Sequence, residues 1–127
     1  METASRIAEL ERVAQGQLEA YGARDIDRFM SYWANDALYY VFPSTLICDG
    51  AAAIRVRHIN RFRDTSLSAR LLKRMVLGNL VVSHEFLTLT FPEGPGTIEL
   101  IAMHEVENGK ITRSWFKLGD PMLDRLP

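Results

Sequence analysis

Apolar residues in the first part of the chain recur at helical spacing. Five positions lie three or four residues apart and predict a helix over residues 5–22: Ile7, Leu10, Ala14, Gln17 and Tyr21. Gln17 is the polar member of this stripe, so its amide is predicted either to bond a neighbouring backbone group or to point into a cavity. Asp25 is a good N-cap for a second, short helix that carries Trp33 on its apolar face and ends before Asn35.

A strand and a third helix are predicted next. The run of residues 37–42 is rich in aromatic side chains and suits a strand, which Pro43 is expected to end. Asp49-Gly50 then introduces a helix over residues 51–63, with Ile54, His58 and Phe62 on one face. The strand therefore lies between two helices in the sequence, and their apolar faces are expected to pack against it.

From Arg70 onward the apolar period is two, which predicts a sheet. The predicted strands cover residues 70–77, 80–91, 97–107 and 110–118, with tight hairpin turns at Gly78-Asn79 and Asn108-Gly109 and a looser turn over residues 92–96. Alternation in residues 80–91 leaves open which set of side chains lies on the concave face of the sheet. The tail, residues 119–127, either covers a pocket mouth or a neighbouring molecule, or is loose.

The turn at Asn108-Gly109 decides which residues of the last hairpin share a face. A three-residue turn separates polar from apolar residues better than a two-residue turn does, so we adopt it. One face then carries Ile98, Leu100, Ala102, His104, Val106, Thr112, Ser114, Phe116 and Leu118. The other carries Glu99, Ile101, Met103, Glu105, Arg113, Trp115 and Lys117, with Glu99 opposite Lys117 as an ion pair.

Length and composition indicate one globular domain over residues 1–127, with 47% hydrophobic and 24% charged residues. The net charge of −1 gives no reason to expect a nucleic acid or an anionic membrane as partner. Cys48 is the only cysteine, which excludes an internal disulfide and a multi-cysteine metal site. The sequence lacks a membrane-length apolar run and a signal-peptide pattern, so a cytoplasmic location is expected.

The third predicted helix carries a run of basic residues: Arg55, Arg57, Arg61 and Arg63. Such a run is typical of a solvated helix face. A phosphate or nucleic-acid site is the alternative, and the absence of an accompanying aromatic stacking platform disfavours it.

Four segments carry a family resemblance: ARDIDRF, ANDALYYVFP, DGAAAIR and HEVENGKIT. In their order and spacing, residues 5–120 resemble the SnoaL-like, ketosteroid-isomerase-like branch of the nuclear transport factor two-like superfamily. The resemblance implies an α+β fold, a cystatin-like roll in which a cone-shaped, curved antiparallel sheet and three N-terminal helices enclose one apolar pocket. Polyketide cyclases, ketosteroid isomerase, limonene epoxide hydrolase and scytalone dehydratase have this fold, as do proteins that only bind.

Two known catalytic sets of this superfamily are not retained. The position of the isomerase's helix tyrosine is Gln17 here, and that of its general-base aspartate is Val41 or Phe42. Of the epoxide hydrolase set only the tyrosine is matched, by Tyr39. Its remaining positions fall on Val41, His84, Phe86 and Phe116.

The resemblance also implies which side chains line the pocket. It turns His84, Phe86, Thr88, His104, Ser114 and Phe116 inward and places Glu85 and Glu99 on the outer face. The predicted catalytic residues are His104, His84 and Tyr39. The predicted substrate-binding residues are Gln17, Trp33, Val41, His58, Phe62, Phe86, Thr88, Leu100, Ser114 and Phe116.

These residues suggest chemistry without a cofactor or metal. A histidine buried among aromatic side chains stays neutral and can take a proton from carbon next to a carbonyl, while a second histidine or Tyr39 donates to the enolate oxygen. We therefore predict an isomerase, cyclase or dehydratase acting on a small hydrophobic carbonyl compound. The alternative is a non-catalytic domain of the same fold that binds a hydrophobic ligand or a partner domain.

The predicted outer face of the sheet is too apolar to remain in water. It comprises Val81, Leu87, Leu89, Phe91, Ile101, Met103 and Trp115. A homodimer through this face would bury it, and we predict one.

Overall fold

The structure is a computed structural model that describes residues 2–124. The helices in this range are α1 (Glu2–Gly22), α2 (Ile26–Met30) and α3 (Ala51–Arg61). The strands are β1 (Trp33–Val41), β2 (Thr45–Asp49), β3 (Ser68–Leu77), β4 (Leu80–Phe91), β5 (Gly94–Glu107), β6 (Lys110–Leu118) and β7 (Met122–Leu123). No helix within residues 2–124 is long and apolar enough to cross a membrane.

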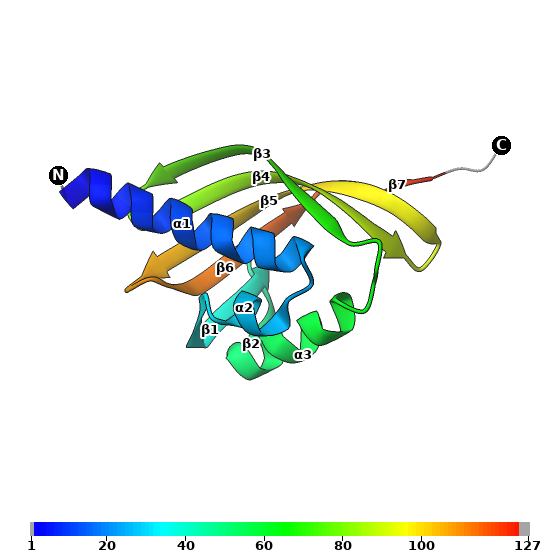
Figure 1. Cartoon of the computed structure of the whole chain (residues 1–127), viewed down its shortest axis with the longest axis horizontal. Coiled ribbons are helices and arrows are strands. Elements are labelled where there is room, and N and C mark those ends of the chain that lie inside the picture. Colours follow the sequence, from blue (N-terminus) through cyan, green and yellow to red (C-terminus); the bar gives the residue numbers. More distant parts are fainter. Residues whose placement is uncertain (1, 125–127) are drawn as a thin grey trace.

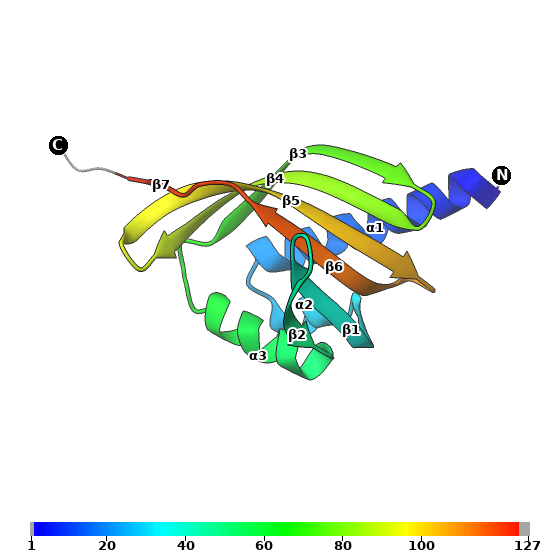
Figure 2. The same cartoon turned by 180° about the vertical axis from the view of Figure 1, so that it is seen from behind.

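The strands form one curved, open sheet that arches over the helices (Figure 1). Its order is β2-β1-β6-β5-β4-β3, and β7 pairs with β5. Only β1 and β6 run parallel among the described strands; the other pairs are antiparallel. Figure 2 shows the same arch from behind, with α2 and α3 below strands β3 to β6. The predicted α+β architecture is confirmed.

The second helix is shorter than the spacing of apolar residues predicted. Asp25 caps it as expected, since its carboxylate accepts a hydrogen bond from the Arg28 amide at 3.1 Å. The helix ends at Met30, however, and Trp33 already belongs to β1, where it pairs with Ile111. Sheet pairing therefore overrides the helical spacing at this point.

Residues 45–49 form a strand that the sequence analysis missed. Pro43 does end the first strand, but the chain then turns back, and β2 pairs antiparallel with β1. Most side chains of β2 are exposed, and Cys48 is the buried exception. A short edge strand of this kind lacks the alternation by which strands are predicted.

α1 packs closely against the sheet and against the segment after α2. Its buried apolar side chains include Leu10, Val13, Ala14, Leu18 and Ala20. Gly16 lets the ring of Tyr32 lie directly against the helix, because a Cβ at this position would overlap the Tyr32 ring.

The pairing of β4 with β5 decides which side chains face the helices. β5 begins at Gly94, opposite Phe91, so only two residues form the turn. Glu85 consequently lies opposite Leu100, and the inner face of β4 carries Val81, Ser83, Glu85, Leu87 and Leu89. The prediction that His84, Phe86 and Thr88 point inward is wrong by one residue. The assignment of Val81, Leu87, Leu89 and Phe91 to the outer face is wrong for the same reason.

The faces predicted for the β5–β6 hairpin are confirmed away from its turn, but the predicted three-residue turn is wrong. Glu107 pairs with Lys110 across the two residues Asn108 and Gly109. A bulge next to Val106 then pairs it with the buried Ile111, which takes the inward place predicted for Thr112. Leu100, Ala102 and His104 lie opposite Leu118, Phe116 and Ser114 respectively. The predicted Glu99–Lys117 pair is wrong, because Lys117 lies opposite Ile101. Glu99 instead places Oε1 3.0 Å from Nε2 of His84 on the outer face.

Candidate functional site

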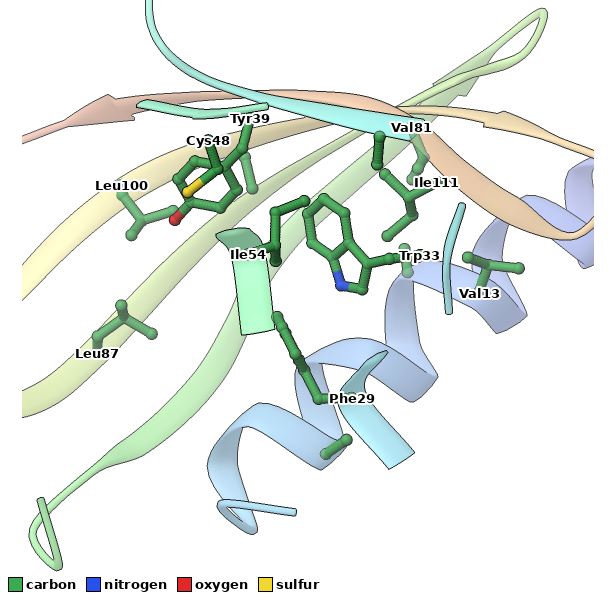
Figure 3. Close-up of a cluster of buried hydrophobic side chains, with 14 of the residues drawn as sticks. Val13, Phe29, Trp33, Tyr39, Cys48, Ile54, Val81, Leu87, Leu100 and Ile111 are labelled. Carbon is green, nitrogen blue, oxygen red and sulfur yellow. The ribbon is translucent and has the colours of Figure 1, made fainter. Parts of the chain in front are cut away.

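A cavity of about 150 Å³ lies between the inner face of the sheet and the helices. Figure 3 shows Trp33 and Tyr39 projecting from β1 into this interior, with Leu87 and Leu100 on the strands beside them. Most of its lining is apolar: Leu18, Tyr21, Phe29, Trp33, Tyr39, Val41, Leu87, Leu89, Phe91, Ile98, Leu100, Phe116 and Leu118. The polar and charged lining consists of Gln17, Arg57, His58, Arg61 and Glu85.

Glu85 is the one carboxylic acid in this lining. It is 5% exposed, and its Oε2 atom has no hydrogen-bond partner among the described residues. Burial raises its pKa from 4.5 to about 7, while the charge of Arg74 acts in the opposite direction. Near neutral pH this side chain can therefore either give or take a proton.

Arg74, on β3, is held behind Glu85 by a small polar network. Its Nε donates to Ser83 Oγ and its Nη1 to Gln15 Oε1, both at 3.0 Å. Its Nη2 is buried without a partner among the described residues, and burial lowers the pKa of the guanidinium. Arg74 thus supplies a fixed positive charge that keeps the pKa of Glu85 from rising further.

His104 lies in the wall behind the cavity and is fully buried. Its Nδ1 is 2.6 Å from Ser114 Oγ, and its Nε2 is 3.5 Å from Nε2 of Gln17. The ring also packs edge-on against Trp33 and Phe116. Burial, with the charge of Arg74 adding to it, lowers the pKa of His104 to about 3. The geometry suits a neutral ring that fixes the amide of Gln17, which itself lines the cavity.

His58, on α3, does line the cavity, as predicted from its place in the apolar row. Its Nδ1 donates to the Ile54 carbonyl at 2.7 Å, which leaves Nε2 as the acceptor. Burial lowers its pKa to about 4, so this ring is neutral at pH 7 and is a weaker base than Glu85.

Two aromatic side chains from β1 bring hydrogen-bond donors to the cavity. The indole Nε1 of Trp33 is buried and has no partner among the described residues. Tyr39 stacks on Phe116 with ring centroids 4.5 Å apart, and burial raises the pKa of its hydroxyl, so the O–H stays protonated. Either group can donate to an oxygen atom of a bound molecule.

The remaining predicted site residues divide into three groups. Val41, Leu100 and Phe116 line the cavity. Phe62 and Ser114 are buried outside its lining, Phe62 against Tyr21 and Ser114 against His104. His84, Phe86 and Thr88 lie on the opposite face of the sheet, and the side chain of His84 is 42% exposed.

Most of the chain matches the model of one protein family. Residues 14–114 match the model of the SnoaL-like domain. The chain belongs to the SnoaL-like domain family. This family includes isomerases and hydrolases. No curated protein matches the sequence of this SnoaL-like domain.

Solved structures support the fold of this SnoaL-like domain. An uncharacterized cystatin fold protein from Novosphingobium aromaticivorans is 24% identical, with a TM-score of 0.76 over 85% of this chain and 96% of that one. An LEH-like epoxide hydrolase from M. tuberculosis is 16% identical, with a TM-score of 0.77 over 88% and 84%. An NTF-2 like protein of unknown function from Burkholderia xenovorans is 16% identical, with a TM-score of 0.73 over 94% and 90%.

Glu85 is the site residue of this SnoaL-like domain that sequence reasoning missed. It was set aside because the parity of β4 was assigned wrongly, although it alternates with Leu87 and Leu89 on what is a strongly apolar face. A carboxylate within such a face itself indicates a candidate functional residue, because acidic residues are rarely buried without a function or a partner. Within residues 2–124, no three His, Cys, Asp or Glu side chains converge as a metal site would require.

Proposed function

We propose that this SnoaL-like domain is a cofactor-free acid–base enzyme, an isomerase, cyclase or dehydratase, for a small and largely apolar carbonyl compound. Glu85 takes the role of the proton carrier in place of the histidines named in the sequence hypothesis. The observation that carries this proposal is the buried carboxyl group in an apolar cavity, with a pKa of about 7 and a free Oε2.

The proton step follows from ordinary enolate chemistry. Ionised Glu85 takes a proton from the carbon next to the carbonyl, and the C–H electron pair forms the carbon–carbon double bond of the enolate. The carbonyl π electrons move onto oxygen. In a β,γ-unsaturated ketone the enolate is conjugated, so protonated Glu85 can return the proton to the γ-carbon while the carbonyl re-forms, which isomerises the substrate. In a β-hydroxy ketone the proton goes to the hydroxyl group instead. Its C–O bond then breaks, the enolate electrons form the α,β double bond, and water leaves. A base positioned in this way contributes a factor of about 10²–10⁴ in rate.

The negative charge that develops on oxygen needs a hydrogen-bond donor inside the cavity. The N–H of Trp33 fits this need because it is buried and has no partner among the described residues. The O–H of Tyr39 is a second donor in the same lining. In a water-poor site such a preorganised donor stabilises the enolate more than it would in bulk water.

Deuterium exchange tests the proposal directly. Cyclohexanone, a small apolar ketone, is incubated with the protein in D2O, and loss of its α-hydrogens is followed by proton NMR. We expect exchange whose rate rises with pH and levels off above an apparent pKa of about 7, since only ionised Glu85 is a base.

A matched pair of variants assigns the activity. Glu85→Gln should lower the exchange rate by about a hundredfold or more. Glu99→Gln makes the same chemical change on the outer face, where Glu99 pairs with His84, and should leave the rate unchanged. Exchange by Glu85→Gln at the wild-type rate would refute the role of Glu85.

A non-catalytic cavity for a hydrophobic ligand is the second candidate. It is favoured by the apolar lining and by the two buried histidines, whose ring nitrogens already bond Ile54 and Ser114. Quenching of tryptophan fluorescence by cyclohexanone with no α-hydrogen exchange at any pH would support this candidate over the enzyme.

A further inference from the structure

The arginines of the basic run on α3 have different surroundings. Arg55 forms an ion pair with Asp27 of α2. Arg63 follows the end of α3 and is exposed, outside the cavity lining. Arg57 and Arg61 lie one helical turn apart, and both belong to the cavity lining. The solvated-face interpretation therefore does not describe these two residues.

Arg57 and Arg61 lie at the mouth of the cavity. Besides lining it, they line a surface depression between α3 and β2, together with Cys48 and Val56. Arg57 is exposed and Arg61 half-buried, so both guanidinium groups reach the boundary between interior and solvent. Arg57 is held there by the ring of Tyr39, whose centroid is 5.5 Å from its Cζ.

Within residues 2–124, no acidic side chain forms an ion pair with Arg57 or Arg61. The ion pairs among the described residues involve Arg28, Arg55, His84 and Arg113, and neither Arg57 nor Arg61. Like charges one turn apart on a helix repel each other. A bound anion would relieve that repulsion, and guanidinium groups bind carboxylates through paired hydrogen bonds.

We propose that the ligand of this cavity is a small apolar molecule with one carboxylate, which Arg57 and Arg61 bind at the mouth while the apolar body enters the interior. The proposal deepens the proposed function by naming its substrate class, and it concerns binding alone. A cavity of about 150 Å³ has room for a body the size of a benzene ring. The lining beyond the arginines is mostly apolar, where a charge would be costly and a hydrocarbon body is favoured.

Benzoate and benzamide make a matched pair of probes, because they have nearly the same shape and differ in charge. Their binding is measured at pH 7 by titration calorimetry. It is also followed by the fluorescence of Trp33 in a Trp115→Phe background, which leaves the cavity tryptophan as the only one. We expect the protein to bind benzoate about tenfold more tightly than benzamide, and this preference to shrink as the salt concentration is raised.

The double variant Arg57→Gln/Arg61→Gln should lose the preference for benzoate and keep its affinity for benzamide, which also shows that it folds. Arg63→Gln removes the same charge from outside the lining and should keep the preference. Equal affinity for both probes in the wild-type protein, failure to bind either, or an unchanged preference in the double variant would overturn the proposal. Glu85→Gln separates this outcome from the acid–base proposal, because it should abolish cyclohexanone exchange while the preference for benzoate persists.

Discussion

The two faces of the sheet carry the same pair of residue types on the same two strands. On the outer face, His84 of β4 and Glu99 of β5 lie 3.0 Å apart, and both side chains are substantially exposed. On the inner face, Glu85 of β4 and His104 of β5 are buried. The outer pair is a solvated contact of a kind that contributes little to stability.

Burial changes the chemistry of the inner residues in opposite directions. It raises the pKa of Glu85 to about 7 and lowers that of His104 to about 3, so each shift favours the uncharged form. Only Glu85 then titrates near neutral pH, and only Glu85 of the two lines the cavity. The comparison shows that residue type alone does not identify the proton carrier. The face and the depth of burial do.

The largest difference in folding stability is expected between alanine substitutions of the two histidines. His104→Ala should lower the free energy of unfolding by about 3 kcal/mol, because it opens a cavity beside Trp33 and Phe116 and leaves Ser114 without its partner. His84→Ala should lower it by no more than about 1 kcal/mol. Urea denaturation measures both, and equal effects would contradict the assignment of faces.

Replacing each of the two glutamates by glutamine should have a different effect on the free energy of unfolding above neutral pH. The folded-state pKa of Glu85 lies above its ordinary 4.5, so stability is lost as pH rises from 4.5 through about 7. Glu85→Gln removes that loss and should raise the free energy of unfolding at pH 8 by about 2 kcal/mol. Glu99→Gln should change it by about 0.5 kcal/mol or less. A loss of stability in Glu85→Gln at pH 8 would show that the carboxylate is stabilised in the fold.

The buried histidines should make the protein sensitive to acid. The folded-state pKa values of His58 and His104 lie below 6.5, so the unfolded chain binds more protons and stability falls as pH drops below 6.5. Glu85 opposes this trend, and we expect a net loss of about 1.5 kcal/mol between pH 7 and about pH 5. Denaturation series across this range test the sum.

The smallest effect on folding is expected from the outer face, where the predicted homodimer would form. The outward side chains include Ile101, Met103 and Trp115, and Ile101 is 39% exposed. Ile101→Lys should change the unfolding free energy of the monomer by about 0.5 kcal/mol or less while abolishing the dimer. Light scattering at micromolar concentration measures the assembly, and a wild-type monomer would count against the prediction.

Most of the fold could be predicted because its strongest patterns are local. The α1 stripe, the Asp25 cap and the alternation of β4 to β6 each follow from spacing or turn chemistry. β2 could not be predicted in this way, since its side chains are largely exposed and only pairing with β1 defines it. Trp33 was assigned to a helix for a similar reason, because its place in β1 depends on Ile111, far away in the sequence.

The candidate site was predicted less completely, because strand parity is set by a turn. Gln17 and His58 lie in the cavity lining as predicted, since each occupies an apolar row of its helix, and Tyr39 does so as the resemblance implied. Trp33 also lines the cavity, but from β1 and not from the predicted helix. The prediction exchanges His84 and Glu85 because it assigns the faces of β4 from the family resemblance, and not from the turn predicted over residues 92–96. In the structure Pro92 and Glu93 alone form it, and every residue of β4 changes face relative to the prediction.

The two-residue turn at Pro92-Glu93 has a consequence for how such a site evolves. β4 holds two complete sets of alternate side chains, and one inserted or deleted residue in the turn would bring His84, Phe86 and Thr88 into the interior in place of Glu85, Leu87 and Leu89. A single codon gained or lost would thus replace the carboxylic acid inside the cavity by an imidazole and a hydroxyl group.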